Sequence, residues 1–98
     1  MGSSSSELNK IIMDIVYDLK PDTILDVGCG TGKWGFLFRE KSDLRMCRRK
    51  KEFGVHIDAI DIDVRWINTI HTYVYNHVYI MDVHKFKPNM KYDLIFMG

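Results

Sequence analysis

The sequence has only two cysteines, two prolines and almost no excess charge, and these shortages exclude several classes of protein. Cys29 and Cys47 form no C-x-x-C pair, so no thiol redox motif is indicated. Fourteen Lys and Arg are balanced by thirteen Asp and Glu, and the net charge of +1 gives no global attraction to nucleic acid or acidic membranes. A signal peptide and a run of about 20 apolar residues are both missing, so we expect no membrane partner and a reducing, cytoplasmic location.

The length of 98 residues predicts one domain with a modest core, because so short a chain buries only about two-thirds of its unfolded surface. Its 46% hydrophobic and 28% charged residues are typical of a folded globular protein. Residues 1–6, MGSSSS, resemble an expression leader, although Met1, Gly2 and Ser6 also fit a permissive acylation pattern. We therefore expect the structured part to begin near residue 7.

An amphipathic helix is predicted over residues 7–20. Its apolar residues recur at the spacing of one helix face, and they are Leu8, Ile11, Ile12, Ile15, Val16 and Leu19. Ser4 and Glu7 have the spacing of a capping box, and Pro21 ends the helix. This helix is expected to dock its apolar face against the rest of the domain.

Four apolar runs predict strands that alternate with helices. The strands are expected at residues 23–27, 55–61, 78–81 and 92–97, the last of them apolar enough to be buried on both faces. Helices are expected at residues 33–41 and 64–73, the second with Asp63 as its N-cap, and the charged residues 42–54 indicate a loop or a frayed helix. This alternation predicts an α/β fold with a parallel sheet.

The stretch TILDVGCGTGKWGFL, residues 23–37, passes from a strand through a glycine-rich turn into a helix. Such a turn lies at the carboxyl end of a strand, where open α/β sheets bind ligands. Glycine permits positive φ and lacks a Cβ, and the amides at the start of the following helix attract an anionic group. The turn that contains Gly28, Gly30 and Gly32 therefore suits a ligand whose negative end approaches the main chain.

Three ligand classes compete for this turn. A phosphate-binding loop, G-x-x-x-x-G-K-[ST], is excluded because Val27 stands five residues before Gly32 and Trp34 takes the Ser/Thr position. A dinucleotide fingerprint, G-x-G-x-x-G, does run from Gly30 to Gly35. A nicotinamide dinucleotide thus stays an alternative.

Two carboxylates favour the third class, a nucleoside that carries a positive charge nearby. Asp26, at the end of the first strand, would repel a pyrophosphate but suits an ammonium or sulfonium group. Asp61 ends the second strand, where a carboxylate accepts hydrogen bonds from both hydroxyls of a ribose, and this serves NAD equally well. The alternative for Asp26 is a buried structural carboxylate bonded to backbone amides.

These features resemble the class I S-adenosylmethionine-dependent methyltransferases. ILDVGCGTG, residues 24–32, is similar to the first motif of that family nearly residue for residue, and HIDAIDID, residues 56–63, resembles the second. YIMDV, residues 79–83, is similar to the third motif, and YDLIFMG, residues 92–98, to the fourth strand. The resemblance implies a Rossmann-like sheet in strand order 3-2-1-4, truncated relative to the seven strands of the family, and a single partial domain with the cofactor-binding half at residues 23–98.

The resemblance also implies roles for individual residues. The glycines of the turn would cradle the methionine portion of S-adenosylmethionine, with Cys29 packed against it. Asp82 would meet the adenine amino group, the amide of Val83 a ring nitrogen, and Ile62 the adenine face, although Asp82 is also a typical cap residue and Ile62 a typical core residue. The predicted cofactor-binding residues are Asp26, Gly28, Cys29, Gly30, Gly32, Asp61, Ile62, Asp82 and Val83.

Other conspicuous residues have structural explanations. Trp34 and Trp66 have spacings that suit packing against the sheet. The four histidines show no short metal-ligand spacing, so no metal site is predicted. Cys29 lacks an obvious base, which disfavours nucleophilic attack. Five cations between Arg45 and Lys51 suit a solvated loop better than an RNA contact, because no aromatic residue interrupts them.

The implied activity is methyl transfer to an unidentified acceptor, which is a protein, an RNA or a small molecule. Displacement from a sulfonium needs donor and acceptor within about 3–3.5 Å rather than an acid, so no catalytic residue is named. An NAD-type oxidoreductase half and a non-catalytic interaction module are the alternatives. The fourth strand is expected as an open edge, and residues 94–97 predict self-association.

Overall fold

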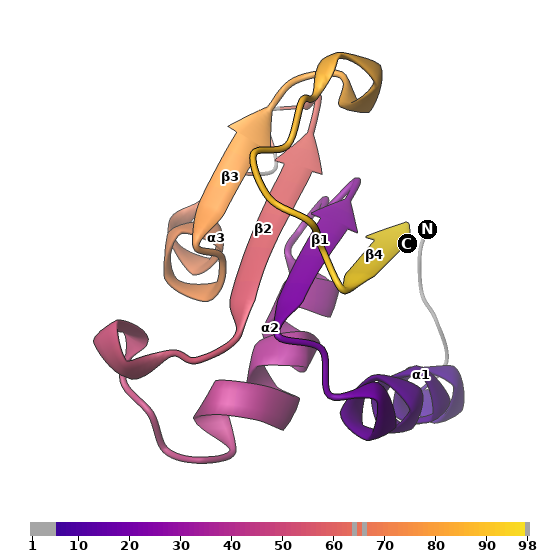
Figure 1. The fold of residues 1–98 in the computed structure, drawn as a ribbon, viewed down its shortest axis with the longest axis vertical. Helices are drawn as coiled ribbons and strands as arrows, with labels where there is room; N and C mark the ends of the chain where they lie inside the picture. The colour runs from indigo at the N-terminus through magenta and orange to yellow at the C-terminus, as the bar shows by residue number, and fades with distance from the viewer. Residues whose placement is uncertain (1–5, 64, 66, 98) are drawn as a thin grey trace.

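Four parallel strands form the sheet of this computed structural model, which describes residues 6–63, 65 and 67–97. The strands are β1 (Thr23–Val27), β2 (His56–Asp61), β3 (His77–Ile80) and β4 (Leu94–Met97), in the order β3-β2-β1-β4 (Figure 1). Every neighbouring pair is parallel, as buried runs of β-branched and apolar residues indicate. The predicted Rossmann-like fold in strand order 3-2-1-4 is confirmed.

The helices follow the strands in the expected alternation, although several of their boundaries are shifted. They are α1 (Ser6–Leu19), α2 (Lys33–Arg39) and α3 (Thr69–Val74), joined by a π-helical turn η1 (Glu40–Leu44) and the 3-10 turns η2 (Lys50–Glu52) and η4 (Val83–Lys85). The third helix was expected from residue 64 but begins at Thr69. Asp63 instead accepts a hydrogen bond from the amide of Arg65, in a local turn before the helix. Ser4 and Trp66 lie outside the described residues.

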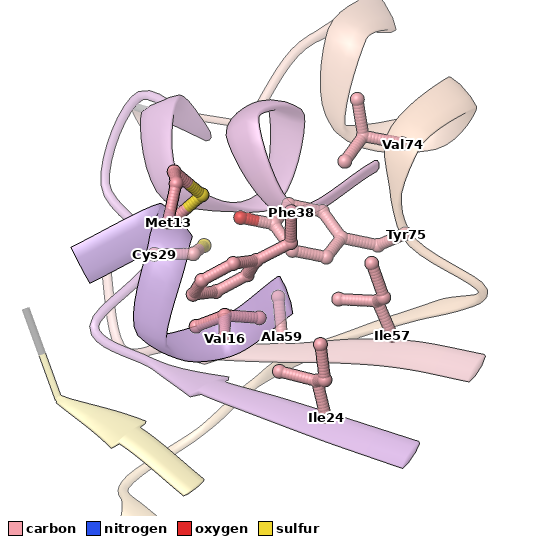
Figure 2. Close-up of a cluster of buried hydrophobic side chains, with 9 residues drawn as sticks. All are labelled: Met13, Val16, Ile24, Cys29, Phe38, Ile57, Ala59, Val74 and Tyr75. Carbon is pink, nitrogen blue, oxygen red and sulfur yellow. The ribbon is translucent and has the colours of Figure 1, made fainter. Parts of the chain in front are cut away.

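The core lies between the sheet and the helices that cover one of its faces. Ile57 and Ala59, two residues apart on β2, point to that face and are fully buried. Figure 2 shows them beneath Phe38 of α2 and Tyr75, which follows α3. Trp34 is partly buried and packs against Phe96 with ring centroids 4.8 Å apart, which confirms its predicted core role. In the described part of the chain, no helix has the length and apolar character needed to span a bilayer.

The opposite face of the sheet is covered by the segment between η4 and β4, which crosses in front of β2 in Figure 1. Tyr92 in this segment donates a hydrogen bond from its hydroxyl to Asp58 of β2, at 2.6 Å. Phe86 packs on Tyr79 of β3, with ring centroids 5.0 Å apart. Ile60, on the same outer face of β2, is also buried.

The expectation that the fourth strand is buried on both faces is wrong. Ile95 is 56% exposed and Met97 is 75% exposed, whereas Leu94 and Phe96 pack against the core. The reason is positional, because β4 is an edge strand and the covering segment does not extend over its outer face. The apolar sequence of β4 thus gives an exposed edge.

Arg39, at the end of α2, organises the charged segment that follows. Its guanidinium is completely buried and donates to the carbonyls of Val74 and Val55, to Asn76 and to Asp43, the last at 2.7 Å. These acceptors lie on η1, before β2 and at or just after the end of α3, so one side chain links three parts of the chain. The segment expected as a loop or frayed helix is therefore held by a buried polar network.

Candidate functional site

A cavity of about 300 Å³ opens at the carboxyl ends of β1, β2 and β3. Its lining residues are Val27, Gly28, Ile60, Asp61, Ile62, Met81, Asp82, Val83 and His84. Five of the nine residues predicted to bind a cofactor meet in this lining, although they come from three separate segments of the sequence. The remaining four, Asp26, Cys29, Gly30 and Gly32, lie in β1 and the glycine turn beside it.

The glycine turn leaves its main chain open to a ligand. Gly28 and Gly30 have φ angles of 72° and 52°, which residues with a Cβ rarely adopt. A Cβ placed on either residue would meet no atom of the other described residues within 4 Å, so their side chains leave the space above both glycines open. The Gly28 amide donates to the carbonyl of Ile60 at 2.7 Å, which holds the turn against β2. The turn is thus a rigid cradle with room for bound atoms.

Asp61 links the end of β2 to this cradle. Its Oδ2 accepts a hydrogen bond from the Gly30 amide at 2.8 Å, and its Oδ1 accepts one from the Asp63 amide at 2.9 Å. The two bonds fix the carboxylate at the cavity wall. Each carboxylate oxygen has a further lone pair, so this anchoring is compatible with the predicted contact to ribose hydroxyls. That contact stays a prediction.

Asp26 lies beneath the turn rather than in the cavity lining, and it is completely buried. Its Oδ2 accepts a hydrogen bond from the Tyr75 hydroxyl at 2.6 Å, whereas its Oδ1 is buried with no hydrogen-bond partner among the residues that the structure describes. Burial raises the pKa of Asp26 from 3.8 to about 6, the Tyr75 hydrogen bond opposes this rise, and the charge of Asp61 adds to it. A half-satisfied buried carboxylate is a costly feature, and it places negative potential under the glycine turn.

Two side chains that the sequence analysis missed support the turn and Asp26, one from α3 and one from the residue that follows it. His71, fully buried, donates from Nε2 to the Gly30 carbonyl at 2.6 Å, and its Nδ1 accepts from the Asn68 amide. Tyr75 comes four residues later, and its hydroxyl donates the hydrogen bond to Asp26. The i, i+4 spacing that places both on one helix face was visible in the sequence, but what this face contacts was not.

Gly35 is needed for this packing rather than for a ligand. A Cβ at Gly35 would lie 2.3 Å from the Tyr75 hydroxyl oxygen, so only glycine lets α2 approach Tyr75 so closely. The third glycine of the G-x-G-x-x-G pattern is therefore explained by contact between α2 and Tyr75.

Cys29 belongs to the core and is a poor nucleophile. The side chain is 5% exposed and joins the cluster in Figure 2. Burial first, and then the nearby charges of Asp26 and Asp61, raise the pKa of the Cys29 thiol to about 12. The thiol stays protonated at neutral pH and packs in the core, and the predicted contact of Cys29 with the cofactor stays a prediction.

The third predicted segment forms the far wall of the cavity. Asp82 caps η4, where its Oδ1 accepts from the His84 amide at 2.9 Å, and this bond holds the pKa of Asp82 below its usual range. Ile62 is 71% exposed and projects at the cavity rather than into the core, so the core alternative for this residue is wrong. Val83 completes the wall, and the adenine contacts predicted for these residues stay predictions.

The basic segment makes mostly local contacts. Arg48 pairs with Asp43 at 2.9 Å, Arg49 pairs with Glu52, and Lys50 donates to the Tyr73 carbonyl. The guanidinium of Arg45 lies 4.8 Å from the centre of the Tyr17 ring. These contacts favour the solvated-loop interpretation over an RNA surface.

A second cavity, of about 260 Å³, lies between α1, η1 and the amino end of β1, with Tyr17, Asp22 and Arg45 in its lining. It is at the wrong end of the sheet for a ligand of this fold, because open parallel sheets bind ligands at the carboxyl ends of their strands. The glycine cradle is therefore the better candidate site.

Two solved structures resemble the chain in fold. The first, described as cmcI-N160 with SAH, has a TM-score of 0.69 and 16% sequence identity over 99% of this chain and 48% of its own. The second, the apo structure of CmcI-N160, has a TM-score of 0.59 and 17% identity over 83% of this chain and 33% of its own. No family model and no curated protein matches the sequence. The chain thus spans less than half of these structures, and the likeness confirms the expected fold.

Proposed function

We propose that the chain binds S-adenosylmethionine and forms the cofactor-binding portion of a methyltransferase, whose acceptor is a protein, an RNA or a small molecule. The observation that carries the proposal is the empty glycine cradle between carboxylates at the carboxyl edge of the sheet. The solved structure of the same fold that is described with SAH supports it, because SAH is what remains of S-adenosylmethionine after methyl transfer.

Different residues of the cavity would contact different parts of such a cofactor. The open main chain at Gly28 and Gly30 admits the amino-acid portion without a clash, since no side chain fills that space. Asp61, fixed by two amides, offers acceptors to the ribose hydroxyls. Ile62 and Val83 give apolar surface for the adenine, and Asp82 gives an acceptor for its amino group.

The sulfonium of the bound cofactor supplies an activated methyl group, so the protein contributes mainly by positioning. The cradle fixes the donor through main-chain contacts, and His71 keeps the cradle rigid through Gly30. The buried negative charge of Asp26 beneath the turn favours a cationic ligand above it. No catalytic residue is assigned.

The NAD-type alternative fits the same residues less well. The buried carboxylate of Asp26 lies beside the turn and disfavours a pyrophosphate at that place, whereas Asp61 suits the ribose of either ligand. The third glycine of the dinucleotide pattern, Gly35, is explained by its contact with Tyr75. A non-catalytic interaction module predicts binding of neither cofactor, so titration with both ligands separates all three functions.

Gly28→Ala is expected to reduce affinity for SAH at least about tenfold, which corresponds to about 1.4 kcal/mol. The added Cβ projects into the space that the ligand needs, and it costs only about 1–2 kcal/mol of stability through the positive φ. Gly54→Ala, outside the cavity lining, is the matched control and should bind SAH as the wild type does. Calorimetric titration measures both, and equal affinities of the two variants would count against the cradle.

The exposed β4 edge is proposed to mediate self-association through residues 94–97. Light scattering should then report a dimer at high protein concentration, and Ile95→Lys should restore the monomer because it charges the exposed face of the strand. Ile15→Lys is the control, since Ile15 is similarly exposed but lies on α1. A monomeric mass for the wild type at every concentration would contradict this proposal.

A cytoplasmic location also stays a prediction. Cys47 is exposed and neither cysteine forms a disulfide in the described part of the chain, which agrees with a reducing compartment.

A further inference from the structure

Three potential metal ligands converge on the sheet face opposite the helices, far from the glycine cradle along β2. His56 and Asp58 are two residues apart on β2, so their side chains share one face. His77 on β3 is the register partner of Asp58, which brings its ring to the same place. Asp61 and the cavity lie at the other end of β2.

The donor atoms of this cluster are close enough to share one ion. His56 Nε2 lies 2.8 Å and His77 Nδ1 lies 3.1 Å from the same oxygen, Asp58 Oδ1. All three donor atoms are within 4.8 Å of one another. Two ligands of a tetrahedral ion at about 2.0–2.1 Å are about 3.3 Å apart, so a small movement of the rings would complete the site.

Hydrogen bonding alone does not explain the position of the His56 side chain. Its Nε2 is buried and has no hydrogen-bond partner in the described structure, because its approach to Asp58 is close but poorly aligned. Buried polar atoms normally have a partner, and a metal ion between the two groups would supply one. The carboxylate itself is 1% exposed, so it is held in place by its surroundings.

Tyr92 gives the cluster a supporting partner. Its hydroxyl donates to Asp58 Oδ2 at 2.6 Å, which orients the carboxylate so that Oδ1 faces the histidines. Metal-binding carboxylates usually have such an outer hydrogen bond. On the other side, the His77 side chain is 60% exposed, which gives an ion and its remaining water ligands access from solvent.

We propose that His56, Asp58 and His77 bind one divalent transition-metal ion, with Zn²⁺ as the favoured occupant. Two imidazole nitrogens and one carboxylate oxygen form a donor set that suits Zn²⁺ and its neighbours in the first transition series rather than Ca²⁺ or Mg²⁺. The ion joins β2 to β3 and, through Tyr92, to the segment before β4. The bound ion would brace these three segments, and its site is independent of the proposed cofactor function.

The test is calorimetric titration of the chain, without any affinity tag, with Zn²⁺, and with Co²⁺ for its visible ligand-field absorption. We expect saturable binding of one ion and a rise in the unfolding temperature that grows with metal concentration. His77→Gln removes a direct, partly exposed ligand. The affinity for Zn²⁺ should fall by more than the roughly 10–100-fold that is expected when only the hydrogen-bond partner of a ligand is lost. His84→Gln, an exposed histidine paired with Asp82, should bind as the wild type does.

Tyr92→Phe gives a second variant that keeps all three ligands. Its affinity for Zn²⁺ should fall about 10–100-fold, because the carboxylate loses the bond that orients it. Circular dichroism verifies that each variant is folded. Absence of one-to-one binding by the wild type would overturn the proposal, and so would folded His77→Gln and Tyr92→Phe proteins that bind as tightly as His84→Gln. In either case the cluster is a hydrogen-bonded brace for Asp58.

Discussion

Arg39→Ala is expected to lower the free energy of unfolding by about 3–5 kcal/mol, the range for breaking a buried ion pair from one side. The stability of a small domain is about 5–15 kcal/mol, so this single change removes a large part of it. The guanidinium is completely buried, and its loss leaves the carbonyls of Val55 and Val74 without their donor. Urea unfolding followed by circular dichroism measures the effect.

Loss of Arg39 is also expected to leave the buried carboxylate of Asp43 poorly compensated. Burial acts to raise the pKa of Asp43, but hydrogen bonds from the Gly54 amide, Arg48 and Arg39 outweigh burial and lower the pKa. Without Arg39, a buried carboxylate keeps its charge and loses its best-buried partner. Arg39→Lys should also be destabilised, because an ammonium cannot reach several acceptors in the fixed geometry of a guanidinium.

Arg65→Ala is the matched control for Arg39→Ala. Arg65 also pairs with an aspartate, Asp63 at 2.7 Å, but its side chain is 84% exposed. Exposed pairs contribute about 0–1 kcal/mol, so the control should unfold almost as the wild type does. Similar losses for Arg65→Ala and Arg39→Ala would contradict the central role given to the buried network.

The second large effect concerns the pH dependence of stability, and Asp26 is its source. The pKa of Asp26 rises from its ordinary value of 3.8 to about 6 in the folded protein, so the folded state holds the proton more tightly than the unfolded state does. The stability contributed by the protonated carboxyl is fully present below pH 3.8 and is lost as the pH rises to about 6. The loss amounts to about 3 kcal/mol.

Asp26→Asn should remove this part of the pH dependence, because the amide does not titrate and still accepts the Tyr75 hydrogen bond. Urea unfolding of both proteins between about pH 4 and pH 7 gives the comparison. The stability of the variant relative to the wild type should rise by about 3 kcal/mol across that interval. A constant difference would mean that the Asp26 carboxyl is not perturbed by burial.

The same variant is expected to bind S-adenosylmethionine more weakly than the wild type does, with a smaller loss for SAH. The reason is that SAH lacks the sulfonium charge that the Asp26 carboxylate would attract. A residue that costs stability at neutral pH while it serves a ligand is typical of functional sites. Equal affinities of wild type and Asp26→Asn for both ligands would assign Asp26 a structural role.

The sequence predicted the strands and the cavity walls well because both follow from local patterns. The apolar run of β1 ends at a glycine turn, and the positive φ angles of Gly28 and Gly30 match what that turn chemistry requires. Asp61 ends β2 and Asp82 comes two residues after the end of β3, so parallel pairing alone brings them to one edge. These features needed no knowledge of tertiary contacts.

Contacts between distant segments were what sequence patterns did not reveal. The sequence analysis assigned no role to Arg39, because several of its acceptors come from segments 16 to 37 residues away. His77 lies 19 residues from Asp58, and only the β2–β3 register places them together. Burial of polar groups depends on such pairings, so periodicity and composition do not predict it.

The start of the third helix shows a different failure. Residues 64–73 were expected to form one helix with Asp63 as its N-cap, and Asp63 does accept a hydrogen bond from the Arg65 amide, as an N-cap would, but α3 begins only at Thr69. The sequence therefore predicted the type of this element better than its boundary.

Calorimetric titration of the wild-type chain with SAH and, separately, with NAD tests most directly whether the glycine cradle receives an adenosyl amino-acid ligand. We expect saturable one-to-one binding of SAH that Gly28→Ala weakens, and no comparable binding of NAD. Tighter binding of NAD than of SAH, or binding of neither ligand by the folded chain, would contradict the proposed function.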